Sequence, residues 1–122
     1  MIYICDTGNN RILEIQRTGS QTLELIRVID SFKGGEGPET FSSPQDVAVT
    51  VDGYIFIADT NNSRILKLDM DLNYVMEFTK PVDATFDQDL SFLPYKLAID
   101  TAGRVYCVAT NVNKGSVSYT HL

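Results

Sequence analysis

The amino-acid sequence predicts an all-β chain built from repeated, four-stranded antiparallel sheets. Three observations predict this fold class. The sequence repeats itself at a spacing of 50 to 53 residues. Each repeat contains short apolar segments of strand length, separated by turns rich in Asp, Asn and Gly. No window of ten or more residues has the periodicity of an amphipathic helix.

The repeat is found in two separate alignments of the chain with itself. Residues 2–13 match residues 55–66 position by position, 53 apart and without a gap. Residues 43–49 match residues 93–99 at a spacing of 50. Two alignments with nearly the same period argue against a chance match and indicate a repeat architecture.

The second repeat is the most complete and defines the expected strands. Asp52-Gly53 forms a turn that tolerates positive φ, and polar turns follow at residues 59–63 and 69–73. The expected strands are residues 46–50, 54–58, 64–68 and 74–78.

Strand polarity indicates how these sheets are arranged. Residues 54–58 are apolar on both faces, as are the equivalent residues 2–5 and 105–108, so we expect both faces to be covered. Residues 64–68 carry two charges, those of Arg64 and Lys67, which suits a more exposed place. Four-stranded sheets repeated every 40–50 residues are typical of a β-propeller.

About two and a half blades fit in the chain, too few to close a ring of four to eight, so we expect an incomplete propeller with exposed apolar faces and a tendency to associate. The expected division is a partial first blade at 1–32, an inter-blade loop at 33–43, a second blade at 44–80, an inter-blade loop at 81–92, a partial third blade at 93–116 and a non-native tail at 117–122.

The two connections and the tail differ from the repeat. Gly34, Gly35, Gly37 and Pro38 predict a flexible surface loop. Residues 79–92 make a second long connection, which carries Asp83, Asp87 and Asp89. Inter-blade connections reach one face of a propeller, where ligands often bind, although ordinary long connections explain both segments as well. Residues 117–122 break the repeat and match a translated sequencing adaptor, so we leave them, with His121, out of the fold and the chemistry.

Residues 3–12, Tyr-Ile-Cys-Asp-Thr-Gly-Asn-Asn-Arg-Ile, resemble the NHL repeat, and so do residues 44–65 over their whole length. The third unit departs from the pattern at Ala109 and Lys114, where the second has Asp59 and Arg64. The resemblance implies a propeller acting as a binding or sensory scaffold for a protein, peptide or carbohydrate. Bacterial relatives often lie outside the cell, so an extracytoplasmic setting agrees with the resemblance. The alternative is a lactonase-like or lyase-like six-bladed enzyme, with a divalent cation in the channel of the full propeller and no cofactor held by this piece alone.

Composition limits the partners. The chain has 10 Lys and Arg against 16 Asp and Glu, a net charge of −6 that argues against nucleic acid, RNA included. No stretch approaches the roughly 20 apolar residues of a membrane span, and residues 1–4 follow a strand pattern at once. Cys5 and Cys107 lie in apolar segments and are interpreted as small buried hydrophobes.

Two acid–base pairs recur at a spacing of five residues. Asp6 with Arg11, and Asp59 with Arg64, are expected to form structural ion pairs across a turn. The alternative is that the neighbouring asparagines line a ligand face; these are Asn9, Asn10, Asn61 and Asn62. No residue pattern indicates nucleophilic catalysis, a phosphate loop or a metal site in this part of the protein.

Overall fold

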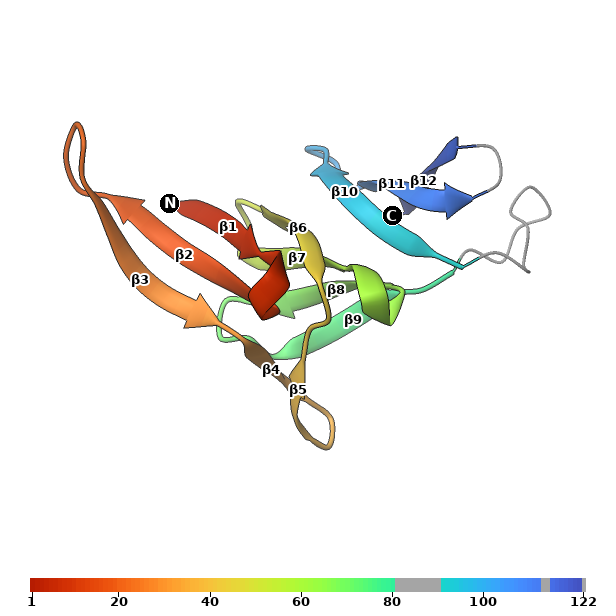
Figure 1. The fold of residues 1–122 in the computed structure, drawn as a ribbon, viewed down its shortest axis with the longest axis horizontal. Coiled ribbons are helices and arrows are strands. Elements are labelled where there is room, and N and C mark those ends of the chain that lie inside the picture. The colour runs from red at the N-terminus through yellow and green to blue at the C-terminus, as the bar shows by residue number, and fades with distance from the viewer. Residues whose placement is uncertain (81–90, 113–114, 122) are drawn as a thin grey trace.

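The computed structural model describes residues 1–80, 91–112 and 115–121. It shows three antiparallel sheets of three or four strands placed side by side in chain order, with a two-stranded hairpin between the first and the second in the sequence (Figure 1). The first sheet has the order β1-β2-β3, the second β6-β7-β8-β9 and the third β10-β11-β12. The all-β prediction is confirmed, and the sheets follow one another as the blades of an incomplete propeller would.

The strands of the first sheet are β1 (Ile2–Asp6), β2 (Arg11–Arg17) and β3 (Leu23–Ile29). Those of the second sheet are β6 (Pro44–Val49), β7 (Tyr54–Asp59), β8 (Arg64–Asp69) and β9 (Tyr74–Phe78). Those of the third sheet are β10 (Leu93–Ile99), β11 (Val105–Val112) and β12 (Gly115–His121). The four strands expected in the second repeat are present, with ends that differ by at most two residues.

Short 3-10 helices join the second strand of a repeat unit to its third. They are η1 (Thr7–Asn9) in the first sheet and η2 (Thr60–Asn62) in the second. Each is followed by a residue in the left-handed region, Asn10 at φ 54° and Ser63 at φ 55°. The two loops therefore have the same backbone course, as the spacing of 53 residues between them predicts.

The connection after β3 is more regular than expected. A hairpin forms from β4 (Ser31–Gly34) and β5 (Gly37–Thr40), and it projects beside β9 (Figure 1). The glycines that suggested a flexible loop lie in and around the turn of this hairpin. The Phe32 side chain anchors it, because the ring is buried and stacks on Phe41 with centroids 5.6 Å apart.

Two other expectations concern the C-terminal half. The connection at 81–92, with Asp83, Asp87 and Asp89, lies almost wholly outside the described residues. Residues 117–121 were left out of the fold, whereas the backbone places them in β12, paired antiparallel with β11. The adaptor origin of this tail stays a prediction.

Two hydrophobic cores lie between the sheets, and β7 contributes to both. Ile55 and Ile57 of β7 are fully buried with Ile12 and Ile29 of the first sheet. Phe56, on the opposite face of β7, packs toward the third sheet in a second core. The prediction that this strand is covered on both faces is confirmed.

Strand β8 is more buried than its charges suggested. Ile65, Leu66 and Leu68 are all fully buried, although Arg64 and Lys67 lie in the same strand. Both cations find places at the edge of the core, since the Arg64 side chain is only 13% exposed and paired, and the Lys67 ammonium lies over aromatic rings. Two charged residues therefore do not indicate an exposed strand when each cation has a specific contact.

Candidate functional site

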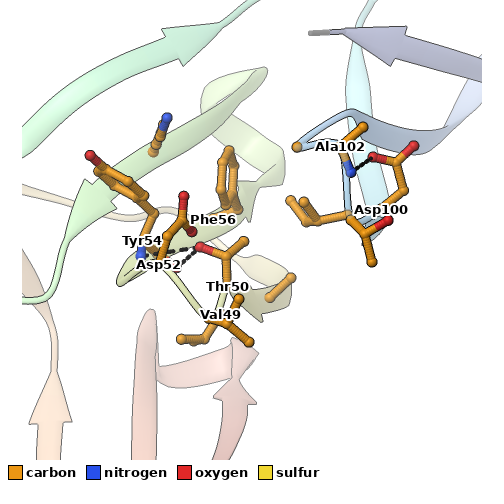
Figure 2. Close-up of a pocket in the computed structure, with 13 residues that line it drawn as sticks. Val49, Thr50, Asp52, Tyr54, Phe56, Asp100 and Ala102 are labelled. Carbon is orange, nitrogen blue, oxygen red and sulfur yellow. Dashed lines mark hydrogen bonds between the residues drawn. The ribbon is translucent and has the colours of Figure 1, made fainter.

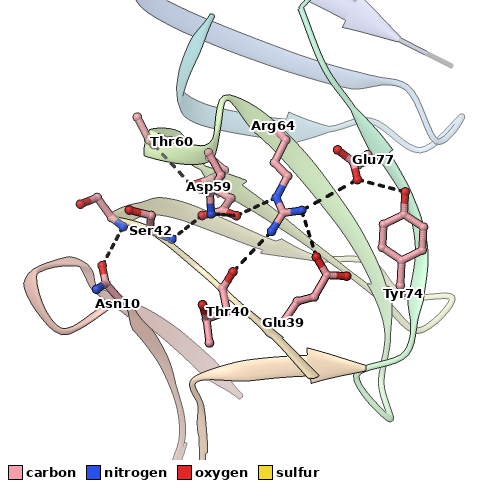
Figure 3. Close-up of polar contacts among 12 residues, drawn as sticks. Asn10, Glu39, Thr40, Ser42, Asp59, Thr60, Arg64, Tyr74 and Glu77 are labelled. Carbon is pink, nitrogen blue, oxygen red and sulfur yellow. Dashed lines mark hydrogen bonds and ion pairs between the residues drawn. The ribbon is translucent and has the colours of Figure 1, made fainter. Parts of the chain in front are cut away.

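The loop between β7 and β8 gathers the polar residues of the repeat motif around one buried carboxylate, that of Asp59 (Figure 3). Arg64 Nε donates to Asp59 Oδ2 at 2.8 Å, and Asn62 Nδ2 donates to the same oxygen at 3.0 Å. The backbone N–H of Ser42 donates to Asp59 Oδ1 at 2.7 Å. The Asp59 side chain has no exposed surface, so these three donors take the place of its hydration.

The first sheet has an equivalent arrangement at its surface. Arg11 Nε donates to Asp6 Oδ2 at 2.7 Å, and Asn9 Nδ2 reaches both Asp6 oxygens at 3.0 and 3.2 Å. The hydrogen bond from Arg11, followed by that from Asn9, lowers the pKa of the Asp6 carboxyl below its ordinary value. Each aspartate faces its arginine across two neighbouring strands of one sheet, and the contact is through Nε alone.

Arg64 makes further contacts that Arg11 lacks. Its Nη1 lies 3.8 Å from Glu39 Oε1 on the hairpin and 3.9 Å from Glu77 Oε1 on β9, and its Nη2 donates to the carbonyl of Thr40 at 3.4 Å. The guanidinium also lies 5.4 Å from the centre of the Phe32 ring. Arg64 therefore joins the hairpin to the second sheet. A shallow depression of about 480 Å³ opens here, lined by Glu39, Thr40, Asn62, Arg64 and Glu77.

The four asparagines of the alternative ligand face make two kinds of contact. Asn9 and Asn62 turn back to the aspartates of their own loops. Asn10 and Asn61 both contact Ser43, which precedes β6: the Ser43 N–H donates to Asn10 Oδ1 at 2.8 Å, and Asn61 Nδ2 donates to Ser43 Oγ at 3.0 Å. The amide groups are thus engaged within the chain.

Sequence reasoning missed the side chains that tie one sheet to the next. Thr7 Oγ1 donates to the carbonyl of Pro44 at 2.7 Å, and the equivalent Thr60 Oγ1 donates to the carbonyl of Pro94 at 2.5 Å. Both hydroxyls follow the motif aspartate directly, and both prolines lie at the start of the first strand of the next sheet. The signal was present in the repeat, because the threonines are 53 residues apart and the prolines 50.

Two charged side chains add further ties between sheets. Asp46 Oδ2 on β6 accepts from the backbone N–H of Leu97 on β10 at 2.8 Å. Arg27 on β3 pairs with the buried Glu14 at 2.7 Å and also donates to the carbonyl of Met70 at 3.0 Å, in the turn after β8. The sheets are therefore fixed to one another by polar links as well as by their cores.

A groove lies between two equivalent turns, the one after β6 and the one after β10 (Figure 2). It encloses about 540 Å³, and its floor includes Tyr54, Phe56 and Lys67. Lys67 Nζ lies 4.2 Å from the centre of the Tyr54 ring and 5.6 Å from that of Phe56, a cation–π arrangement. Asp52 lines one side and Asp100 the other.

Backbone hydrogen bonds fix the acidic turns at this side of the sheets. The N–H of Arg104, the largest influence, lowers the pKa of the Asp100 carboxyl. The N–H of Asn73 likewise lowers the pKa of Asp69 in the turn after β8. These carboxylates shape their turns by accepting N–H groups from the residues that follow.

The chemistry for catalysis is sparse in the described part of the chain. No group of three or more His, Cys, Asp or Glu side chains there is placed to hold a metal ion. Burial raises the pKa of the Cys5 thiol to about 11 and that of Cys107 to about 12, which disfavours the reactive thiolate. None of the described helices has the length and apolar character needed to cross a bilayer.

Successive antiparallel sheets, joined face to face by equivalent residues of a sequence repeat, define this chain as a set of β-propeller blades. The NHL repeat model matches residues 41–68, which cover the start of the second sheet through β8. Residues 41–68 are therefore an NHL repeat.

The chain is similar to several known proteins over most of its described length. It is 27% identical over 114 residues to a protein of Caenorhabditis elegans described as a probable peptidyl-alpha-hydroxyglycine alpha-amidating lyase, over 92% of this chain and 31% of the relative. It is 36% identical over 75 residues to NHL repeat-containing protein 2 of Homo sapiens, and 38% identical over 76 residues to the same protein of Gallus gallus. Each of those alignments covers 61% of this chain and 10% of the relative. The chain thus spans about a third of the lyase and a tenth of the other two.

Proposed function

We propose that these blades are part of a scaffold that binds a protein or peptide partner at the groove between the second and third sheets. The observation that carries the proposal is that the motif residues make hydrogen bonds within the chain. Asp59, Thr60 and Asn62 are engaged in links within or between sheets, so the repeat supplies a rigid frame. A rigid frame that presents turns is the usual basis of a binding platform.

The groove has the side chains that recognise a peptide segment. Tyr54 offers an aromatic surface, and the Lys67 ammonium above it supplies a positive charge for a carboxylate. Asp52 on one rim supplies a carboxylate for backbone or basic groups, whereas the Asp100 carboxylate on the other rim is paired with Arg104 at 3.0 Å. A carbohydrate is the second ligand class that an aromatic ring beside carboxylates accommodates, and a glycan array tests it directly.

Selection of a random peptide library against the chain tests the proposal. Peptides that bind through the groove are expected to lose at least tenfold in affinity for Lys67→Met, which keeps the length of the side chain and removes the charge. Lys33→Met is the matched control, because Lys33 lies exposed on the hairpin and has the same charge. Binders that are indifferent to Lys67→Met, or the absence of any binder, would contradict a peptide site at this groove.

The alternative is that the parent protein is a lyase-type propeller enzyme. It is favoured by the similarity to the amidating lyase, which extends over 92% of this chain. The test is incubation of the full-length protein with a peptide ending in α-hydroxyglycine, followed by mass spectrometry. Appearance of the amidated peptide above the uncatalysed rate would establish the enzyme, and a rate equal to that of buffer would exclude this activity.

A further inference from the structure

Strand β9 is the outermost strand of the second sheet, and its outer edge is open. It pairs with β8 on one side, and over Tyr74–Phe78 no other described strand pairs with it. The first and third sheets pack against the two faces of the second sheet, whereas this edge points away from both (Figure 1). Alternate residues of an edge strand present unpaired N–H and C=O groups, which can accept an added strand.

The start of this edge already pairs with one residue of the hairpin. The backbone N–H of Lys33 on β4 donates to the carbonyl of Leu72 at 2.8 Å, and Lys33 forms an isolated parallel bridge with Asn73. Strand β4 ends at Gly34, so the pairing does not continue along β9. The edge thus has the geometry for strand pairing, and the length of β9 is left for a longer partner.

The sequence protects the edge of the hairpin but not that of β9. Strand β5 contains Pro38, which has no N–H to donate to an added strand. Strand β9 has the sequence Tyr-Val-Met-Glu-Phe, with no proline and one charged residue, Glu77. Because proline and multiple charges are the usual means of blocking an exposed edge, the edge of β9 keeps its capacity to pair.

The charge beside this edge selects the partner. The Glu77 side chain is 32% exposed, and that of Glu39 on the hairpin is 48% exposed. Both point toward the Arg64 guanidinium, which is mostly buried and already paired with Asp59 (Figure 3). The two carboxylates line the depression between the hairpin and the second sheet, so an approaching chain meets negative charge there.

From the open edge and its charge we infer that β9 binds an extended, basic segment of a partner protein, which adds a fifth strand to the second sheet. Alternate side chains of an added strand lie beside Glu77, where lysine or arginine reaches the carboxylates. The side chains between them lie on the opposite face beside Met76, by its register with Lys67, and suit apolar residues. A second copy of the chain would bring a like-charged edge, which argues against pairing of β9 with itself. This surface is separate from the groove proposed above.

The test uses a labelled octapeptide of alternating lysine and valine, and fluorescence anisotropy measures its binding to the chain. The control peptide alternates lysine and proline, so it has the same charge but cannot form a ladder of strand hydrogen bonds. We expect the lysine–valine peptide to bind at least about tenfold more tightly than the control, because main-chain hydrogen bonds supply much of the affinity in strand addition. Equal affinities would show that charge alone attracts the peptide and would overturn the inference, as would the absence of binding by either peptide.

Single variants test where the peptide binds. Glu77→Gln is expected to weaken binding of the lysine–valine peptide about threefold to fivefold, because it removes one exposed charge pair and keeps the shape of the side chain. Glu39→Gln should have a similar effect, and it decides the question if circular dichroism shows that Glu77→Gln is unfolded. Glu24→Gln is the matched control, because Glu24 lies exposed on β3, the outermost strand of the first sheet. Equal losses for Glu24→Gln and Glu77→Gln would assign the binding to net charge and would overturn the inference.

Hydrogen–deuterium exchange of the chain with the lysine–valine peptide locates the contact. Exchange should slow within residues 74–78, because the outer N–H groups of β9 gain partners in the complex. Protection confined to another segment, such as β3, would overturn the inference.

Discussion

Removal of the Arg64 guanidinium is expected to destabilise the chain far more than removal of the equivalent Arg11. In Arg64→Ala the Asp59 carboxylate stays fully buried and keeps two donors, Asn62 and the Ser42 N–H. Breaking a buried ion pair costs about 3–5 kcal/mol, and the two remaining hydrogen bonds favour the lower end, so we expect a loss of about 3 kcal/mol.

The Arg11→Ala variant is the matched control, because the motif, the strand register and the Nε–Oδ2 contact are the same. The distance from Nε to Oδ2 is 2.7 Å in the Arg11 pair and 2.8 Å in the Arg64 pair. The Arg11 side chain, however, is 41% exposed, whereas that of Arg64 is 13% exposed. Water replaces a lost partner at an exposed pair, so this variant should unfold close to the wild type.

Urea unfolding followed by circular dichroism, at one fixed protein concentration, measures the free energy of unfolding of both variants. A double variant, Asp59→Ala with Arg64→Ala, completes the comparison. It should be more stable than Arg64→Ala alone, because the uncompensated carboxylate is gone. Equal losses for Arg64→Ala and Arg11→Ala would refute the reasoning, since burial would then not control the strength of the pair.

Three further predictions follow from the same structure. Thr60→Val should lower the free energy of unfolding by about 1–2 kcal/mol in urea titrations, because it removes the hydrogen bond between the second and third sheets. Asp69 and Asp100 have pKa values lowered by backbone hydrogen bonds, so the stability they add is present above about pH 4 and is lost as the pH falls through their folded pKa values. Replacing both with Asn should flatten the dependence of the urea midpoint on pH between about 4 and 2. Cys5 and Cys107, with raised pKa values, should react slowly with iodoacetamide at pH 8 and rapidly once urea unfolds the chain.

The sequence repeat predicted the sheets of this chain because each repeat of 50 to 53 residues corresponds to one sheet. Strands of the second repeat, the turn at Gly53 with φ 91° and the coverage of β7 on both faces were all readable from residue type and spacing. The loop pairs were also suggested by spacing, since a carboxylate and a guanidinium five residues apart face each other across a short turn.

Other features depended on contacts between segments distant in the sequence. The hairpin of β4 and β5 has a glycine-rich turn that sequence reasoning interpreted as a flexible loop, and only the burial of Phe32 against Phe41 shows why it is ordered. The groove is formed by turns about 50 residues apart in the sequence, so no local pattern indicates it. The bond from Thr60 to Pro94 spans 34 residues, so only a comparison of the repeats, and no local pattern, indicated it.

The third repeat shows what the buried pair requires. Ala109 occupies the position of Asp59 and is just as buried, at 1% exposure against none for the aspartate. A buried carboxylate needs a guanidinium to compensate its charge, whereas a buried alanine has no charge to compensate. The arginine is therefore not required where the aspartate is absent. The sequence has Lys114 where the second repeat has Arg64, and the two differences occur together. The third repeat thus lacks both motif residues, and Ala109 still packs in an apolar core with Phe56 of the second sheet.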